Sequence, residues 1–236
     1  MDALPKPRLR IAVLGAGGRA GRAAVEEAHA RGHRVVAIVR DPQRYPDLAR
    51  ERITVVRGDA LDPGSVVAAT AGCDAIVAAV TPFTAPPDSF EGFDASYYER
   101  VADGLIAAGQ AGARRILVVS LFATLDLPDG RPVFDDSRAF PAELRPFAAA
   151  HAAGTARLTA SDPDVDWLAL APPPQLIPGG PRTGHYRLGD HTVDLATEAS
   201  LSYADLAIAI LDEIERPTRH REHIAVSGVS TATPAR

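Results

Sequence analysis

Short apolar runs alternate with longer amphipathic segments along most of the chain. Runs rich in valine, isoleucine and leucine predict strands at residues 9–14, 34–39, 53–56, 74–80, 115–119, 166–170 and 223–226. Apolar residues spaced three and four apart predict helices at residues 19–30, 63–71, 94–109, 141–161 and 203–216. Strands that alternate with helices are typical of right-handed crossovers and a parallel sheet covered on both faces. The predicted fold class is therefore α/β, a doubly wound parallel sheet with a small C-terminal extension on the substrate side.

The boundaries of this domain follow from where the pattern begins and ends. Residues 1–8 form a leader, residues 9–227 a single domain, and residues 228–236 a small polar tail that we expect to be flexible. A proline- and glycine-rich run at residues 171–181 follows the strand at 166–170. Because ligands of open parallel sheets bind beyond the carboxyl ends of the strands, we expect this run to form one wall of a pocket.

Composition and charge narrow the functions that such a domain can have. Of the 236 residues, 46% are hydrophobic and 23% are charged, which provides enough apolar material for a sizeable core. The net charge of −5 offers no basic surface for a phosphate backbone, so we expect no nucleic-acid partner. No stretch approaches the roughly 18 apolar residues that span a bilayer, and no apolar signal core follows Met1, so we expect no membrane partner and a cytoplasmic location. The single cysteine, Cys73, excludes an internal disulfide.

The turn between the first strand and the first helix is the strongest local signal in the chain. It reads Gly15-Ala16-Gly17-Gly18-Arg19-Ala20-Gly21. Gly15 permits a tight turn, and Gly21 lets the helix pack close to the sheet. A glycine at 17 or 18 lets backbone amides approach a diphosphate, which the positive end of the helix also attracts. The turn therefore predicts a Rossmann-type dinucleotide site, whereas a P-loop would need a lysine where Arg19 stands.

The residue that follows the second strand bears on the choice of dinucleotide. Arg40 stands close to the point where NAD-binding proteins carry an acidic residue that holds the ribose hydroxyls. A guanidinium there, helped by Arg19 or Arg44, can pair with a 2′-phosphate. We therefore predict NADP (NADPH) as the cofactor and NAD as the less favoured one. The alternative is that Arg40 is a solvated charge and Asp41 holds the ribose.

Further contacts to the dinucleotide are expected where later strands end. Asp59 can accept a hydrogen bond from the adenine amino group, and the small residues at 78–80 let the middle of the cofactor pass over the sheet edge. Asp62 is instead predicted to cap the helix entered through Pro63. The predicted cofactor-binding residues are Gly15, Gly17, Gly18, Arg19, Ala20, Gly21, Arg40, Asp59, Ala60, Ala78, Ala79, Val80, Ser120 and Pro172.

Four stretches of the chain resemble one known family. They are the glycine turn at 15–21, the Gly58-Asp59 pair, the stretch Pro178-Gly179-Gly180-Pro181-Arg182-Thr183-Gly184-His185-Tyr186-Arg187-Leu188-Gly189, and the segment 211–217. Over residues 11–228 the sequence resembles the atypical short-chain dehydrogenase/reductases, within them the NADH-flavin reductase branch and its NmrA-like and epimerase-dehydratase relatives. The resemblance implies a dinucleotide in the glycine turn, with its nicotinamide facing the loop after residue 170.

The basic residues restrict the chemistry of the site. Typical short-chain dehydrogenases use a Tyr-x-x-x-Lys pair to protonate the reduced carbonyl, but the only lysine of this chain is Lys6. A carbonyl reductase would need another acid, and His151, on the helix where that pair usually lies, is the best candidate. Tyr98 is the second candidate for a proton donor. Ser120, at a strand end, is placed to touch the nicotinamide ribose or the substrate.

Hydride transfer to a flavin or quinone needs no dedicated acid, because the charge is delocalised over the acceptor ring. We therefore predict an NADPH-dependent oxidoreductase, with FMN or FAD as a substrate rather than a bound prosthetic group. Phe83, Phe122 and Ile177 are possible surfaces for the acceptor ring. Two alternatives stay open: a tailoring reductase, epimerase or dehydratase of a secondary metabolite, and a non-catalytic NADPH sensor.

Metal chemistry is not predicted. His185 and His191 flank an expected hairpin and could join Asp190 or Asp194, but a third well-spaced ligand is missing. The expected partner is a small-molecule hydride acceptor, and the expected assembly is a monomer or homodimer.

Overall fold

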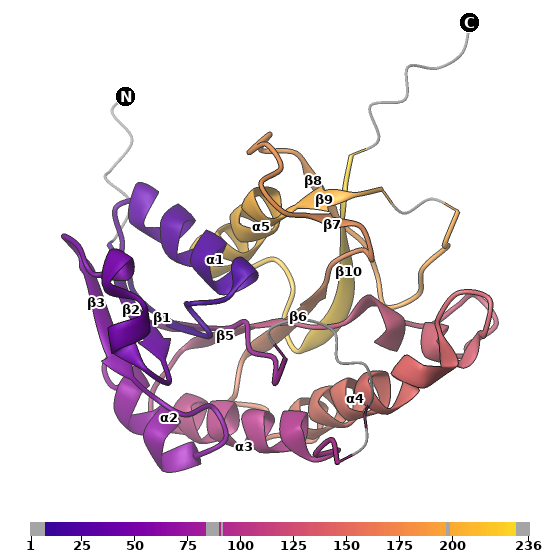
Figure 1. Cartoon of the computed structure of the whole chain (residues 1–236), viewed down its shortest axis with the longest axis horizontal. Coiled ribbons are helices and arrows are strands. Elements are labelled where there is room, and N and C mark those ends of the chain that lie inside the picture. The colour runs from indigo at the N-terminus through magenta and orange to yellow at the C-terminus, as the bar shows by residue number, and fades with distance from the viewer. Residues whose placement is uncertain (1–7, 84–89, 91, 197–198, 230–236) are drawn as a thin grey trace, which may run out of the picture.

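The computed structural model describes residues 8–83, 90, 92–196 and 199–229 (Figure 1). The leader before residue 8 and the tail after residue 229 lie outside the described residues. Among the described residues, no helix combines the length and apolar character that a membrane crossing requires.

One eight-stranded sheet organises the molecule (Figure 1). Its order is β3-β2-β1-β4-β5-β6-β10-β8, and every pairing is parallel except that of β10 with β8. The strands are β1 (Arg10–Leu14), β2 (Arg34–Val39), β3 (Ile53–Arg57), β4 (Ala75–Ala78), β5 (Arg115–Val119), β6 (Trp167–Ala171), β8 (Tyr186–Leu188) and β10 (Glu222–Gly228). A separate parallel pair joins β7 (Leu176–Ile177) to β9 (Leu201–Ser202). The predicted doubly wound α/β fold is confirmed.

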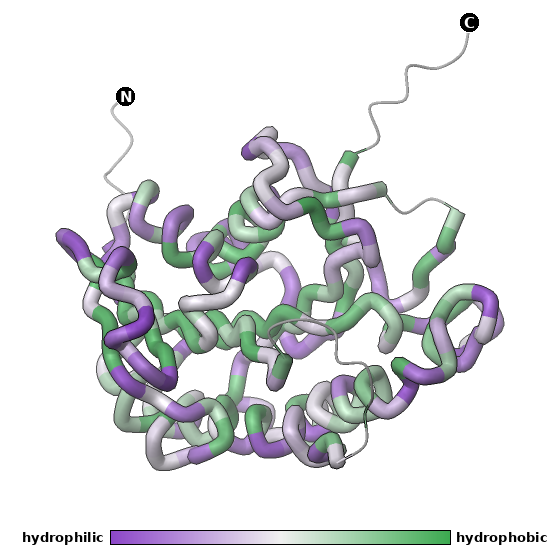
Figure 2. Tube along the Cα trace, viewed as in Figure 1, coloured by the Kyte–Doolittle hydropathy of each residue, from purple (hydrophilic) through white to green (hydrophobic). Residues whose placement is uncertain are grey.

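Helices cover both faces of the sheet (Figure 1). The helices α1 (Arg19–Ala30) and α5 (Tyr203–Glu215) lie on one face, whereas α2 (Pro63–Thr70), α3 (Tyr97–Gln110) and α4 (Arg145–Thr159) lie on the other. The central strands are apolar at nearly every position because each face is buried: Ile11 and Val13 pack towards α1 and α5, and Ala12 and Leu14 towards α3. Figure 2 shows these central strands as largely hydrophobic trace.

Several predicted boundaries shift for local reasons. The helix expected from Asp94 begins at Tyr97, because the Asp94 carboxylate accepts hydrogen bonds from the backbone and hydroxyl of Ser96 and holds a turn there. The helix expected over 141–161 is a 3₁₀ turn at Ala142–Leu144 followed by α4. The expected hairpin between His185 and His191 is wrong, since β8 pairs with β10, far along the chain.

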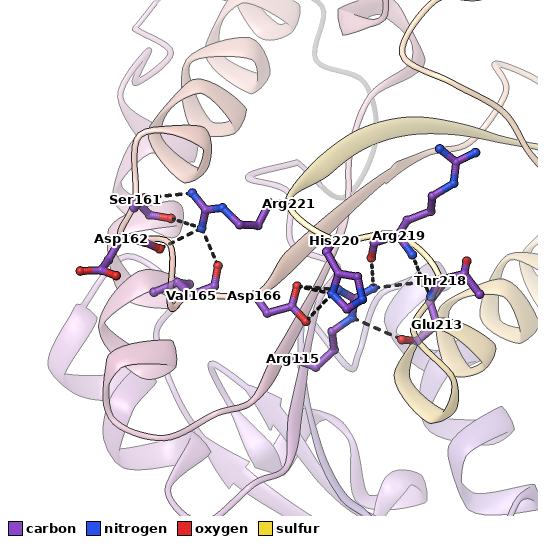
Figure 3. Close-up of polar contacts among 10 residues, drawn as sticks. All are labelled: Arg115, Ser161, Asp162, Val165, Asp166, Glu213, Thr218, Arg219, His220 and Arg221. Carbon is purple, nitrogen blue, oxygen red and sulfur yellow. Dashed lines mark hydrogen bonds and ion pairs between the residues drawn. The ribbon is translucent and has the colours of Figure 1, made fainter.

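The amino end of the sheet is closed by a buried arginine (Figure 3). Arg115 is only 4% exposed, and its guanidinium donates to Asp166 (2.8 Å), to Glu213 (3.1 Å) and to the carbonyl of Arg219 (2.7 Å). Glu213 in turn accepts from the backbone and hydroxyl of Thr218. Each charge in this group is therefore matched by a partner from another element.

A second arginine closes the C-terminal end of α4 (Figure 3). Arg221 has a φ of 54°, and its guanidinium donates to the carbonyls of Ser161 (3.0 Å), Asp162 (2.8 Å) and Val165 (2.7 Å). Carbonyls that follow a helix end have no partner within the helix, so these bonds fix the chain between α4 and β6.

Candidate functional site

The glycine turn lies at the carboxyl end of β1 and forms the floor of a groove. Gly15 has a φ of +77°, and a Cβ there would overlap the carbonyl oxygen of Ala79. A Cβ on Gly21 would overlap the carbonyl oxygen of Gly15, so α1 packs directly on the turn. Gly18 caps α1 without a side-chain hydrogen bond. Within the turn, the amides of Gly15 and Ala16 donate to the carbonyl of Ile38, and the amide of Gly18 donates to the carbonyl of Gly15. The N–H groups suited to an anion are therefore those at the start of α1.

The groove has a volume of about 440 Å³, which lies in the range of small-molecule sites. It runs between the ends of β1, β2, β3 and β4. Nine of the predicted cofactor-binding residues line it: Gly15, Gly17, Gly18, Arg19, Arg40, Asp59, Ala60, Ala79 and Val80. The structure places the other five elsewhere: Ala20 and Gly21 in the first turn of α1, Ala78 and Ser120 along a smaller adjoining cavity, and Pro172 buried after β6.

One end of the groove carries two arginines. Arg40 and Arg44 both line it, and neither takes part in an ion pair with another described residue. Asp41, the alternative ribose ligand, caps the 3₁₀ turn Pro42–Arg44 by accepting a hydrogen bond from Gln43 at 3.1 Å. This end of the groove therefore carries the positive charge of Arg40 and Arg44, and one oxygen of the Asp41 carboxylate is already hydrogen-bonded to the Gln43 amide.

Tyr45 adds a feature that the motif alone does not predict. Its ring lies against the Cα of Gly17, so any side chain at 17 would overlap it. Tyr45 sits between the two 3₁₀ turns Pro42–Arg44 and Pro46–Leu48, and lines the groove beside Arg44. Gly17 is thus explained by the aromatic ring above it as much as by a ligand. Asp62 accepts from Gly64 and Ser65 and caps α2, as predicted.

The opposite end of the groove is bordered by aromatic rings. Phe83 lines the groove and packs against Phe90, Phe93 and Phe147, with ring centroids 5.5, 5.6 and 5.8 Å away. We call these four residues the phenylalanine cluster. Of the other surfaces considered from sequence, Phe122 is 5% exposed in a separate core cluster and Ile177 lies on β7, away from the groove lining.

A small cavity beside the groove brings the three predicted catalytic residues together. Tyr98 from α3, Ser120 after β5 and His151 from α4 all line it, and its volume is about 20 Å³. The Tyr98 and His151 rings are stacked, with centroids 3.6 Å apart. Gly154 permits this arrangement, because a Cβ there would lie 2.7 Å from the Tyr98 Cβ. At Gly154, α4 therefore comes into direct contact with the backbone of α3.

Burial keeps both stacked rings uncharged at neutral pH. It lowers the pKa of His151 to about 3, with a smaller contribution from the nearby His223. Burial also raises the pKa of the Tyr98 phenol, and the neighbouring Thr81 hydroxyl offsets part of this shift without meeting the geometry of a hydrogen bond. An imidazolium acid at position 151 is therefore unfavourable near pH 7.

The Arg-Thr-Gly-x-Tyr part of the C-terminal motif anchors a loop. Arg182 donates two hydrogen bonds of 2.9 Å to the buried carboxylate of Glu27 on α1. Asp205 on α5 accepts from the backbone and hydroxyl of Thr183 and from the backbone of Gly184. These contacts, which we call the Arg182 clamp, tie the loop before β8 to both helices on that face of the sheet.

No metal centre is evident in the part of the chain that the structure describes, where no three histidine, cysteine or carboxylate side chains converge. His191 lies 3.5 Å from Asp126 and 3.1 Å from the carbonyl oxygen of His223.

Comparison with known proteins adds four findings. A family model described as NAD(P)H-binding matches residues 15–217. A proposed epimerase from Bacteroides thetaiotaomicron is 28% identical with a TM-score of 0.80, covering 96% of this chain and 100% of its own. A proposed NADH-flavin reductase from Streptococcus pneumoniae is 27% identical with a TM-score of 0.74, covering 94% and 100%. A Streptomyces 3-diazoavenalumate denitrifying reductase is 36% identical over 134 residues, which cover 54% of this chain and 42% of its own.

Proposed function

We propose that this chain, which belongs to the NAD(P)H-binding family, is an NADPH-dependent reductase. It passes hydride to a flat, conjugated acceptor such as a flavin or a quinone. The observation that carries the proposal is the continuity of one groove. It begins at two arginines that form no ion pair with another described residue, passes over the glycine turn, and ends at the phenylalanine cluster. Along this groove the arginines complement the charge of a nucleotide phosphate, and the phenylalanine rings complement a planar ring.

The arginine end supports NADPH over NADH. Arg40 and Arg44 can both reach into the groove where the adenosine ribose of a dinucleotide would lie, and a 2′-phosphate would complete their unpaired charge. The glycine turn also suits the diphosphate, because α1 follows it without a side-chain cap and offers the N–H groups of its first turn to an anion. The bound cofactor would supply the hydride, and the chain would supply position and charge.

The aromatic end supports a planar acceptor. Phenylalanine rings exclude water and favour stacking with conjugated rings, which brings donor and acceptor to reacting distance. The names of two similar proteins, an NADH-flavin reductase and a 3-diazoavenalumate denitrifying reductase, are compatible with reduction of aromatic compounds. FMN or FAD would then be a substrate that leaves after reduction.

The remaining expectations join the proposal. The partner would be a small-molecule hydride acceptor, the assembly a monomer or homodimer, and the location the cytoplasm, where NADPH is available. Neither a nucleic acid nor a membrane enters the proposed reaction.

The test is a pair of titrations followed by an acceptor screen. The protein should bind NADPH more tightly than NADH, and should oxidise NADPH when FMN or duroquinone is added. Arg40→Glu should weaken NADPH binding by about 1.5–3 kcal/mol and leave NADH nearly unchanged, because a charge-assisted pair is lost. Arg57→Glu is the matched control, since Arg57 ends the neighbouring strand but does not line the groove. Equal affinity of Arg40→Glu for both cofactors, unchanged from the wild type, would refute the choice of NADPH.

A further inference from the structure

The small cavity beside the groove has the size of a single oxygen atom or water molecule. Its volume of about 20 Å³ exceeds the roughly 10–15 Å³ that one water needs, and is far below what a ring would occupy. The Tyr98 hydroxyl and the Ser120 Oγ are both buried, and neither makes a hydrogen bond with any described residue. Both residues line the cavity, and buried hydroxyl groups without a described partner are unusual in a protein interior.

The cavity adjoins the groove and lies close to Phe147 of the phenylalanine cluster. Val80 lines both, and Tyr97, which lines the groove, has its ring centroid 4.9 Å from that of Tyr98. Phe147 of the phenylalanine cluster lies 5.8 Å from Tyr98 and 4.7 Å from His151. A planar acceptor among those phenylalanine rings would therefore have an edge near the cavity.

We propose that this cavity receives the reducible oxygen of the acceptor, that Tyr98 is the proton donor to this oxygen, and that the acceptor is a quinone or conjugated carbonyl compound rather than a flavin. The inference rests on the proposed reductase function and names its substrate class. An oxygen atom projecting from a ring fits the cavity, and the two hydroxyls can both donate to it. The atom of a flavin that takes hydride, N5, lies inside the ring system and cannot enter a cavity of this size.

The chemistry balances without another reactant. Bound NADPH would supply a hydride to a carbon of the acceptor, and the electron pair of the C=O π bond would move onto the oxygen. The O–H bond of Tyr98 breaks, its proton passes to that oxygen, and Ser120 holds the oxygen with a second hydrogen bond. The Tyr98 phenolate then regains a proton from water, for which the exposed Thr81 hydroxyl beside it offers a route. The acceptor is reduced by two electrons and NADPH is oxidised to NADP⁺.

His151 has a different task in this arrangement. It stacks on Tyr98 with an angle of 29° between the ring planes, and its own pKa near 3 keeps it neutral. A Cβ on Gly154 would overlap the backbone of Tyr98, so the glycine lets α4 pack closely against this residue. His151 is therefore a positioning residue, which fixes the plane of the phenol and thereby the direction of its hydroxyl.

The decisive experiment compares two acceptors in Tyr98→Phe. This variant should lower kcat for duroquinone at least about 100-fold, the usual contribution of a positioned acid, and leave NADPH affinity unchanged. Any slow FMN reduction by the wild type, in which Tyr98 has no part, should fall far less. A readout without turnover is calorimetric titration of duroquinone into the NADP⁺-loaded protein. Affinity should fall about tenfold in Tyr98→Phe, as expected when one hydrogen bond is lost.

Two controls separate the possible results. Tyr186→Phe removes a hydroxyl that bonds to Asp212, remote from the groove, and should keep duroquinone turnover. Ser120→Ala should weaken duroquinone binding without affecting FMN. Wild-type turnover of duroquinone by Tyr98→Phe overturns the inference, as does an equal loss of duroquinone and FMN reduction with NADPH still bound. Absence of NADPH oxidation by the wild type with both acceptors overturns the proposed function itself, and the inference with it.

Discussion

Buried polar groups at the two ends of the sheet differ in whether they have hydrogen-bond partners within the chain. At the amino end, Arg115 and Glu213 are nearly fully buried and hold each other and their neighbours with matched hydrogen bonds (Figure 3). At the carboxyl end, the hydroxyls of Tyr98 and Ser120 are buried with no described partner. Two other buried nitrogens of the described residues also lack a partner: the indole nitrogen of Trp167, near the amino end, and the Nε2 of His223 on β10.

This difference indicates which buried polar groups stabilise the fold and which are available to bind a ligand. A buried charge that serves only the fold must be satisfied within the chain, because removing it from water is costly. Polar groups left open beside a groove are instead completed by a molecule from outside. The contrast predicts that substitutions at the amino end act on the free energy of unfolding, and that those at the carboxyl end act mainly on binding.

The largest effect is expected at the amino end. Arg115→Met would leave the buried carboxylate of Glu213 without its cation and lower the free energy of unfolding by about 3–5 kcal/mol. Urea unfolding would measure it. Arg114→Met is the matched control: its side chain is 74% exposed and pairs with Asp74, so the loss should stay below about 1 kcal/mol. Similar losses in the two variants would contradict the role given to burial.

The next effect lies at the glycine turn and distinguishes strain from contact. Gly15→Ala places a Cβ against Ala79 at a φ of +77°, whereas Gly130→Ala has a φ of +82° with nothing within 4 Å. In both variants the left-handed backbone should lower the free energy of unfolding by about 1–2 kcal/mol. The loss should be larger in Gly15→Ala, because its Cβ also overlaps Ala79. Calorimetry should show NADPH binding abolished only in Gly15→Ala. Retained binding would mean that the turn tolerates a side chain.

A third prediction concerns pH. The folded pKa of His151, about 3, lies below the ordinary value of 6.5, so the unfolded chain takes up its proton first as pH falls. This residue therefore costs stability progressively below about pH 6.5, by up to about 1.4 kcal/mol per pH unit. Burial also lowers the pKa of His223 to about 3, so His151→Phe should remove about half of that slope in urea unfolding between pH 7 and pH 4, and His223 should keep the rest. His185→Phe, at an exposed histidine, should leave the slope unchanged. A wild-type slope in His151→Phe would place the titration elsewhere.

The smallest effect is expected at the Arg182 clamp. The Arg182 side chain is 59% exposed, so solvent screening limits the loss in Arg182→Ala to about 1 kcal/mol at pH 7. The hydrogen bond from Arg182 lowers the pKa of Glu27 below its ordinary 4.5, so this stabilisation exists above that pH and fades as Glu27 is protonated. The gap between wild type and variant should therefore narrow below pH 4. Arg138→Ala, at an exposed arginine, should show neither the loss nor the pH dependence.

Much of the fold could be predicted from the sequence because its signals are local. Continuous apolar runs mark strands buried on both faces, and Asp62 before Pro63 marks a helix start. The resemblance to the atypical short-chain dehydrogenase/reductases is confirmed by the family match and by the structural neighbours. The two-residue strands β7 and β9 were not predicted, since so short a segment carries no periodicity.

The site was less accessible to sequence reasoning because it depends on contacts between distant segments. The stacking of Tyr98 on His151 requires the crossing of α3 and α4, which the glycine at 154 permits. The ring of Tyr45 over Gly17 depends on two consecutive proline-started turns. Phe122 is an aromatic residue of the kind that could contact an acceptor ring, but it is buried in a core cluster. Hydrophobicity alone does not distinguish a core residue from a residue at a binding surface.

The anchoring of α4 by Arg221 matters for redesign of the molecule. Because Arg221 holds the chain just after α4, the helix that carries His151 and Gly154 is attached at the end remote from Phe147. Engineers who wish to exchange one acceptor for another can therefore vary Phe83 and Phe93 on the long β4–α3 connection while keeping that helix as a fixed frame.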